Sequence, residues 1–362
     1  MDRAARNLPG VRPQGRLRML PWLLLLAVLV AQLAMPETVQ LGFAFAVVAP
    51  LTSLVYGVLG TSMVAAVMTG VLLVPEVRAE HVSSGDILAF ALIGAVSAFL
   101  AWVRSRRDDQ LVSVRTVAEA AQLAVLPPLP ARVDRVRCGA LYRAAERAAL
   151  VGGDLYDVQQ GPYGVRAVVA DVQGHGLSAV ATVAALLGTF REAVLDEPEL
   201  EGVATRLDRR LVVDSARQED AELFATAVLV EFPGAGGEGD GGQAVVRVLS
   251  CGHPPPVLVT RGGAREVMLE PGLPLGLDLG DGFRAPAPVS VPLGPSDVLL
   301  AYTDGVTEAR DSEGAFYPLV ARIRPDRDPA ALVRSVWRDL SSYAGEVPDD
   351  VALLALRLSP GD

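Results

Sequence analysis

Aspartates stand at four places where an apolar stretch of this chain begins or ends. They are Asp154 in "VGGDLYDV", Asp171 in "VVADVQGHG", Asp304 in "LLAYTDGVTEA", and the pair Asp349 and Asp350 in "VPDDVALLALRL". A strand end holds a side chain rigidly, and a neighbouring glycine lets the backbone turn away so that a metal ion can approach. A single Asp-Gly pair is typical of an ordinary turn, but four such places together favour a site for divalent cations.

Chemistry through a protein nucleophile has less support in the sequence. Cys138 and Arg143 in "CGALYR" are separated by four residues, whereas a thiolate phosphatase loop needs five, and Arg137 stands where such loops carry histidine. We therefore interpret Cys138, and likewise Cys251, as a buried small apolar residue. The sequence contains no lysine, which excludes a P-loop lysine and Schiff-base catalysis, and the glycine-rich "PGAGGEGDGG" is typical of a flexible loop.

Two histidines lie in the same half of the chain as the aspartates. His175 follows Asp171 by four residues and is either a general acid or a residue that forms a turn or hydrogen-bonds to a neighbour of the site, and we favour the second interpretation. His253 in "CGHPPPVL" is interpreted as a residue that shapes a loop, so neither histidine is counted as catalytic. Histidine and cysteine lack zinc-ligand spacing here, and the aspartates offer the oxygen ligands that hard divalent ions prefer.

Short β-like runs and amphipathic helices must position the aspartates. The predicted strands are Arg137–Tyr142, Leu155–Gln160, Val165–Val172, Phe224–Phe232, Ala244–Ser250, Pro256–Thr260, Val298–Tyr302 and Val351–Leu358. The predicted helices are Ser178–Val194, Leu200–Asp214 and Pro329–Tyr343. Strands outnumber helices and the helices gather in two places, which predicts an α+β fold with a largely antiparallel sheet system.

The chain before residue 104 has a different character. The mean hydropathy of the whole chain is +0.35, which is high for a wholly soluble protein. The excess lies in four uncharged stretches, namely Leu20–Met35, Val39–Tyr56, Gly57–Val74 and Ile87–Val103. We interpret them as about four transmembrane helices, since roughly 20 apolar residues cross a bilayer. Three spans with a re-entrant piece are the alternative, because Pro50 and Gly57 interrupt this region.

Charges around these stretches predict their orientation. Arginines precede the first stretch and follow the last, at positions 3, 6, 12, 16 and 18 and at positions 104, 106 and 107, whereas the loop 75–86 is net acidic. The positive-inside rule then places both flanks, and the domain that follows, in the cytoplasm, where thiols are reduced. A cleaved signal peptide is disfavoured because further spans follow at once. Residues 111–362 hold 23 basic and 35 acidic side chains, which argues against a nucleic-acid surface.

The expected organisation has four parts. They are a basic cytoplasmic N-terminus at 1–19, a membrane region at 20–103, a helical linker at 104–130 and a catalytic domain at 131–362. In the linker, a seam of apolar residues recurs at helical spacing before "LPPLP" ends the helix, and it consists of Leu111, Val114, Ala118, Ala121 and Val125. Such a seam can pair two protomers in a homodimer or pack one helix on its own domain, and the sequence leaves both open.

Seven sequence blocks, taken in order, resemble a known family. The blocks "GGDLYD", "DVQGHG", "FATAVL", "SCGHPPPVL", "LPLGL", "YTDGVTEARDSEGAFY" and "DDVALLALR" are similar to those of bacterial metal-dependent Ser/Thr phosphatases of the PPM (PP2C-like) superfamily. The similarity points to the SpoIIE- and RsbU-like branch, which regulates sporulation and stress sigma factors. It covers about residues 120–358 and leaves out the membrane region. The implied fold is a β-sandwich with helices on both outer faces.

The resemblance also implies a site, a cofactor and a substrate. The implied metal-site carboxylates are Asp154, Asp171, Asp304 and Asp349, with Asp350 and the backbone carbonyl of Val172 as further ligands. Asp171 would bridge two Mn²⁺ or Mg²⁺ ions. Two such ions can lower the pKa of a bridging water and screen a phosphate, so that no protein nucleophile is required. The implied substrate is a phosphoserine or phosphothreonine on an anti-anti-sigma-type protein.

Two functions of other classes stay open. One is a pseudophosphatase, a membrane-tethered binding module that keeps the fold without turnover, and the intact aspartates argue against it. The other is a two-metal nucleotidyl cyclase, for which the sequence offers no candidate purine or triphosphate contacts. Hydrolysis of a chromogenic aryl phosphate with Mn²⁺, compared with nucleotide turnover, separates the three.

Overall fold

The structure is a computed structural model of the whole chain. It describes residues 15–34, 42–71, 84–126, 128–144, 152–174, 176–216, 223–234, 244–270, 272–277, 282–345, 347 and 349–359. The chain divides into two compact units, Met1–Val114 and Arg115–Asp362. The division falls inside the predicted linker, within one continuous helix.

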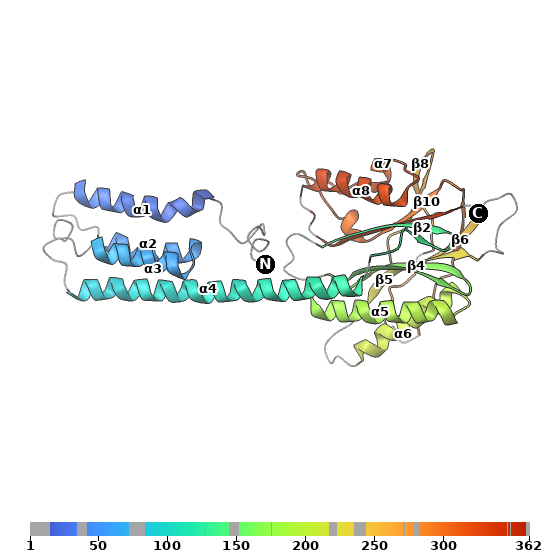
Figure 1. Cartoon of the computed structure of the whole chain (residues 1–362), viewed down its shortest axis with the longest axis horizontal. Coiled ribbons are helices and arrows are strands. Elements are labelled where there is room, and N and C mark those ends of the chain that lie inside the picture. Colours follow the sequence, from blue (N-terminus) through green and yellow to red (C-terminus); the bar gives the residue numbers. More distant parts are fainter. Residues whose placement is uncertain are drawn as a thin grey trace. The chain divides into compact units, whose positions relative to one another are not determined.

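Helices make up the described part of the first unit (Figure 1). They are α1 (Gly15–Ala34), α2 (Gly42–Val55), α3 (Val58–Val71) and the first part of α4 (Ser84–Val125). Each overlaps one of the four apolar stretches, and Pro50 lies inside α2 without ending it. A small core joins α2 and α3 through Val48, Ala49, Val64 and Met68.

Helix length limits how many of these elements can span a membrane. By length and composition, only Ile87–Arg107 of α4 passes as a spanning helix among the described residues of this unit. Helices α2 and α3 have 14 residues each, so each is about 21 Å long, against a hydrocarbon core of about 30 Å. The expectation of four complete transmembrane helices is therefore not supported.

Two antiparallel sheets form the centre of the second unit. Sheet A has the strand order β1 (Arg132–Val133), β2 (Val136–Arg143), β11 (Val351–Leu358), β10 (Val298–Tyr302), β7 (Val257–Thr260) and β8 (Gly263–Glu266). Sheet B has the order β3 (Asp154–Gly161), β4 (Gly164–Val172), β5 (Ala225–Pro233), β6 (Ala244–Cys251) and β9 (Val289–Leu293). Their facing sides share one apolar core, which includes Val169 and Val228 from sheet B and Leu299 and Leu354 from sheet A.

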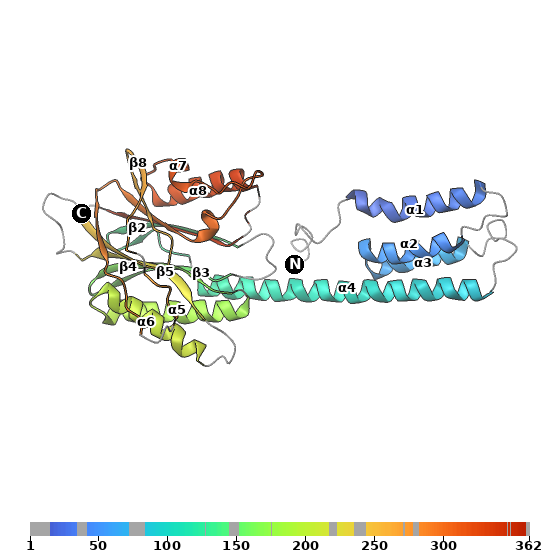
Figure 2. The same ribbon diagram turned by 180° about the vertical axis from the view of Figure 1, so that it is seen from behind.

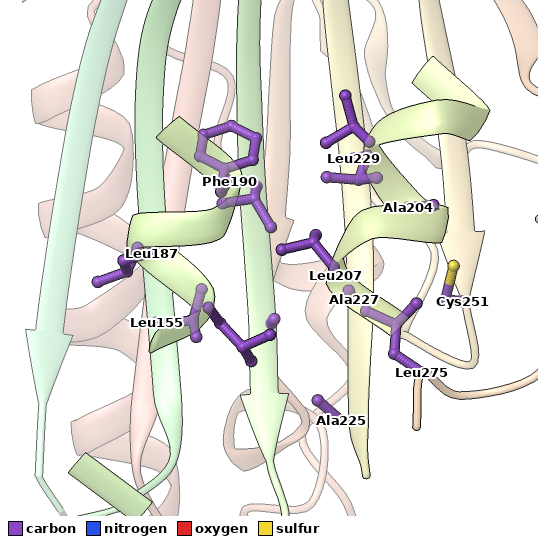
Figure 3. Close-up of a cluster of buried hydrophobic side chains, with 14 of the residues drawn as sticks. Leu155, Leu187, Phe190, Ala204, Leu207, Ala225, Ala227, Leu229, Cys251 and Leu275 are labelled. Carbon is purple, nitrogen blue, oxygen red and sulfur yellow. The ribbon is translucent and has the colours of Figure 1, made fainter. Parts of the chain in front are cut away.

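Helices cover the outer face of each sheet, as Figure 2 shows from behind. Sheet B carries α5 (Leu177–Asp196) and α6 (Leu200–Ser215), and Figure 3 shows Leu187, Phe190 and Leu207 of these helices over Leu155 and Leu229 of the strands. Sheet A carries α7 (Leu319–Arg322) and α8 (Pro329–Ala344). Helix α5 also passes a length-and-composition test for a membrane span, but half of it is buried in this core, as expected of a core helix in a soluble domain.

A buried ion pair fixes the connection between α5 and α6 to sheet B. Arg166 and Glu231 are cross-strand partners on β4 and β5, and Arg166 Nε donates to Glu231 Oε2 at 2.7 Å. The guanidinium also donates to the carbonyl oxygens of Glu197 and Pro198, which lie between the two helices. The fully buried arginine is thus paired and hydrogen-bonded, which is the condition for keeping a charge inside a protein.

The predicted strands and long helices of this unit are confirmed to within two residues at each end. The sequence analysis missed β1, β8, β9 and α7. Those strands are two to five residues long, and β9 contains Pro292, which weakens a strand prediction. Pro292 is tolerated because β9 is an edge strand of sheet B.

Candidate metal centre

Strand register brings two of the aspartates together on sheet B. Asp154 at the start of β3 pairs with Asp171 near the end of β4, and Asp171 pairs in turn with Thr226 on β5. Residues in one cross-strand row project from the same face of a sheet. Because Val169 and Val228 belong to the core between the sheets, and side chains alternate along a strand, this row faces sheet A.

The same alternation places polar side chains of sheet A opposite the row of Asp154, Asp171 and Thr226. Ala301 and Ala352 lie in the inter-sheet core, so Thr303 and Asp350, each two residues away, also face sheet B. Thr303 is fully buried, and its hydroxyl donates to Asp154 Oδ2 at 2.6 Å and accepts from the Ala352 amide at 2.9 Å. The hydroxyl of Tyr142, on neighbouring β2, donates to Asp350 Oδ2 at 2.8 Å.

The remaining aspartates lie on the segments that leave sheet A. Asp304 opens a short 3₁₀ helix, Asp304–Val306, directly after β10. Asp349 is exposed, while Asp350 is buried, and the Asp350 amide donates to Asp349 Oδ1 at 2.8 Å. The structure therefore brings all five predicted carboxylates to one end of the sandwich, two from sheet B and three from sheet A.

Glycines allow these segments to approach closely. A Cβ on Gly153 would overlap the carbonyl oxygen of Val172, and one on Gly152 would overlap the Asp350 carboxylate. A Cβ on Gly305 would overlap the Asp350 carbonyl. These glycines are therefore required by the close packing of neighbouring segments, a reason different from the predicted approach of a metal ion.

Burial, and after it mutual repulsion, raises the pKa of three carboxylates in the cluster. Burial, and then the negative charge of Asp171, raises the pKa of Asp154 well above its ordinary value, although the hydrogen bond from Thr303 opposes this. Burial and the charges of Asp304, Asp349 and Asp350 raise the pKa of Asp171 to about 7. The pKa of Asp304 is also raised, first by burial and then by Glu308 and Asp349. Carboxylates that repel one another in this way are stabilised by a cation among them.

The donor set fits a hard divalent cation. Five carboxylates and a nearby backbone carbonyl supply oxygen ligands, which Mn²⁺ and Mg²⁺ prefer. Among the residues described here, no three His, Cys, Asp or Glu side chains are already arranged as a set of metal ligands. The chemistry of the donor atoms thus matches a hard divalent cation.

The other residues that the sequence singled out have clear positions, with one exception. His175 lies outside the described residues. Cys138 and Cys251 are buried, and burial raises the pKa of their thiols to about 11 and about 12, so neither is a thiolate at neutral pH. Their prediction as small buried residues is confirmed. His253 is buried in the loop after β6, and its contacts are described below.

Sequence reasoning missed the neutral hydrogen-bond partners of the carboxylates. Thr303 and Tyr142 contact Asp154 and Asp350, and Thr226 stands beside Asp171 in the strand row. The two-residue alternation within each predicted strand could have placed Thr303 on the inner face. No pattern in the sequence indicated which residue on the opposite sheet it would meet.

The fold is that of the PP2C phosphatases. The SiaA-PP2C domain of Pseudomonas aeruginosa matches with a TM-score of 0.53 at 19% identity, covering 71% of this chain and 98% of that domain. A family profile described as Stage II sporulation protein E (SpoIIE) matches residues 161–359, more than half of the chain. The chain therefore belongs to the SpoIIE family.

A curated relative from the same family carries a functional name. The chain is 25% identical over 178 residues to "Phosphoserine phosphatase RsbP" of Bacillus subtilis (strain 168). That match covers 48% of this chain, and the chain spans only 40% of the length of that relative.

Proposed function

We propose that this protein is a metal-dependent protein serine/threonine phosphatase that hydrolyses phosphoserine or phosphothreonine with a metal-activated water. The convergence of five repelling carboxylates at one end of the sandwich carries the proposal, and the names of the SpoIIE family and its phosphoserine phosphatase relative support it. Neither cysteine can serve as an alternative nucleophile at neutral pH, because burial keeps both thiols protonated.

We assign metal binding to the carboxylates and their orientation to two neutral hydroxyl groups. Asp154, Asp171, Asp304 and Asp349 would hold two Mn²⁺ or Mg²⁺ ions, with Asp350 and the Val172 carbonyl as additional oxygen donors. When bound, such ions lower the pKa of a coordinated water and offset the charge of the phosphate. Thr303 and Tyr142 orient two of the carboxylates through hydrogen bonds from their hydroxyls.

Metal-dependent hydrolysis is the direct test. The purified protein should hydrolyse a chromogenic aryl phosphate and a phosphoserine peptide with Mn²⁺ or Mg²⁺, and a chelator should abolish both activities. Asp304→Asn should lower turnover by orders of magnitude, because it removes a ligand charge. A non-catalytic binding module is the second candidate, favoured by the lack of a ready-made ligand set within the described residues. Metal binding without hydrolysis of either substrate would support that candidate.

We further propose that the first unit anchors the protein in the cell membrane. Large apolar side chains are exposed along all four helices, among them Leu26, Leu54, Leu59 and Leu92. Apolar surface of this extent is normally buried against a membrane or another protein. Segments as apolar as these favour contact with the hydrocarbon core of a membrane.

Contacts near Arg104 support a cytoplasmic boundary at this point of the helices. Trp22 Nε1 donates to the Tyr56 hydroxyl at 3.1 Å, and Arg104 donates to the Tyr56 carbonyl at 3.0 Å. The start of α1, the α2–α3 turn and the arginine-rich part of α4 therefore share one level, where aromatic and basic residues favour the membrane interface. Helices α2 and α3 would form a hairpin that opens away from this level. Whether the hairpin crosses fully or only partly, the number of crossings is even.

We also propose a class of substrate and an oligomeric state for the protein. Membership of the SpoIIE family supports an anti-anti-sigma-type phosphoprotein as substrate, hence a role in a partner-switching pathway. The predicted seam lies on α4, which runs without a break from Ser84 to Val125, although the side chains of the seam itself lie outside the described residues. A continuous helix can pair two protomers through such a seam, and we propose a homodimer on this basis.

A further inference from the structure

The carboxylate cluster is divided between two sheets, so its geometry depends on how the sheets are held relative to each other. Asp154 and Asp171 come from sheet B, whereas Asp304, Asp349 and Asp350 follow or precede strands of sheet A. Without a metal the carboxylates of the two sheets repel one another. Hydrogen bonds between neutral groups of sheet A and sheet B can hold the two sets of carboxylates at a fixed separation.

His253 joins the two sheets at this end of the sandwich. Its Nδ1 lies 2.8 Å from the hydroxyl oxygen of Thr226, and its Nε2 lies 3.0 Å from the carbonyl oxygen of Tyr302. Thr226 is the cross-strand partner of Asp171, and Tyr302 precedes Asp304 by two residues. The imidazole thus links the cross-strand partner of Asp171 to a residue that closely precedes Asp304.

The chemistry of the two partners fixes the protonation of the ring. A backbone carbonyl can only accept, so Nε2 must carry the proton and donate to Tyr302. Nδ1 is then the acceptor for the Thr226 hydroxyl. One neutral imidazole therefore satisfies both partners, and burial lowers the pKa of His253 to about 4, which keeps the ring neutral at physiological pH.

The backbone of His253 is held as firmly as its ring. The Ser250 hydroxyl donates to the His253 carbonyl at 2.9 Å and accepts from the His253 amide at 3.1 Å. Three prolines follow at positions 254–256 and restrict the backbone leading into β7. The ring is therefore a rigid connection, suited to setting a distance between two elements.

We propose that His253 is a positioning residue that sets the separation of the two halves of the carboxylate site, acting through Thr226 toward Asp171 and through Tyr302 toward Asp304. This inference rests on the proposed metal-dependent function. It predicts that loss of either hydrogen bond weakens metal binding more than it weakens folding, because groups that orient metal ligands contribute about 10–100-fold to metal affinity.

Two substitutions of His253 each remove one of the two hydrogen bonds of its ring. His253→Asn keeps an acceptor near the position of Nδ1 but loses the donor to Tyr302, and His253→Gln keeps a donor near Nε2 but loses the acceptor for Thr226. Thr226→Val breaks one bond without altering the histidine, so it serves if the His253 variants fold poorly. The matched control is Val291→Ala, a buried residue of the inter-sheet core on β9, an edge strand that carries none of the five aspartates.

The measurement is Mn²⁺ binding to the metal-stripped full-length protein in mild detergent, by isothermal titration calorimetry, alongside thermal unfolding. We expect each of the three site variants to bind Mn²⁺ about 10–100-fold more weakly, and Val291→Ala to bind like wild type at a similar loss of melting temperature. At saturating Mn²⁺ the variants should recover most of their turnover. Wild-type Mn²⁺ affinity in all three variants would overturn the role of His253. If wild-type protein bound no Mn²⁺, the proposed function itself would fall, and this inference with it.

Discussion

The Thr303 hydroxyl on sheet A donates a 2.6 Å hydrogen bond to the Asp154 carboxylate on sheet B, although 149 positions separate the two residues in the sequence. Burial, and then the neighbouring negative charges, raises the pKa of Asp154, and this hydrogen bond opposes the increase. The hydroxyl also accepts from the Ala352 amide at 2.9 Å. One side chain therefore orients a carboxylate of the site and satisfies a backbone group of β11.

Thr303→Val should damage both stability and activity. It leaves Asp154 Oδ2 and the Ala352 amide without this partner, at a cost of about 1–3 kcal/mol in the free energy of unfolding. Turnover of the aryl phosphate should fall about 10–100-fold, since the hydroxyl orients a proposed ligand. Urea unfolding and steady-state kinetics measure the two effects. Thr303→Ser is the control, because it keeps the hydroxyl; equal losses in both variants would contradict this role.

Metal-free protein should lose stability as the pH rises. The folded pKa of Asp171, about 7, lies above its ordinary value of 3.8, so between these values the folded state holds a proton that the unfolded chain has released. The stability that the protonated Asp171 carboxyl contributes is fully present below pH 3.8 and is lost as the pH rises through about 7. In chelator, the melting temperature should fall from about pH 5 to about pH 8, and Mn²⁺ should restore it.

Asp171→Asn tests the origin of that pH dependence. The amide carries no charge at any pH in this range, so the variant should lose less stability over the same interval and should be more stable than wild type without metal at the alkaline end. Its activity should nevertheless be lost with Mn²⁺ present. A wild-type pH profile in the variant would show that other groups cause the effect.

Cys138→Ala should retain phosphatase activity within about twofold, since a residue remote from the reacting atoms contributes little to turnover. Burial raises the pKa of the Cys138 thiol to about 11, so almost no thiolate exists at neutral pH to act as a nucleophile. Kinetics on the aryl phosphate, with and without prior treatment by an alkylating reagent, measure this. Activity that disappears in the variant but survives a chelator would instead favour a thiolate mechanism.

A topology reporter should find the catalytic domain in the cytoplasm. A reporter that is active only outside the cytoplasm, fused after Asp362, should be silent, because the arginine-rich flanks keep both ends of the membrane region inside. The same reporter inserted in the loop 75–86 should be active and serves as the positive control. Activity of the fusion after Asp362 would require an odd number of crossings and would overturn the proposed arrangement.

Charge in the linker seam tests the proposed homodimer. Leu111→Asp combined with Val114→Asp places two carboxylates in the seam, which should dissociate paired helices and change the rate on a protein substrate without altering any ligand. Ser113→Asp with Thr116→Asp adds the same charge off the seam as a control. Light scattering of the purified full chain measures the mass. A dimer with wild-type kinetics in the seam variant would show that the linker is a passive tether.

The sequence by itself determined eight of the described strands, the three long helices of the second unit and the five aspartates near strand ends. Short apolar β-runs, such as Val298–Tyr302, and helical spacing of apolar residues in segments such as Leu200–Ser215 are local patterns. Aspartates marked the strand ends, and at three of the four places a glycine stands beside or just after the aspartate. These features depend on near neighbours in the chain, so they could be predicted without a fold.

The tertiary structure alone decided which groups meet across the sandwich. The contact of Thr303 with Asp154 and the His253 bridge between Thr226 and Tyr302 join residues of different sheets. Their existence depends on the packing of one sheet on the other, which alternation within a strand does not specify. The same holds for the raised pKa of Asp171, since burial and charges from sheet A cause it. Local patterns therefore identified the candidate ligands, and long-range packing determined their hydrogen-bond partners and their raised pKa values.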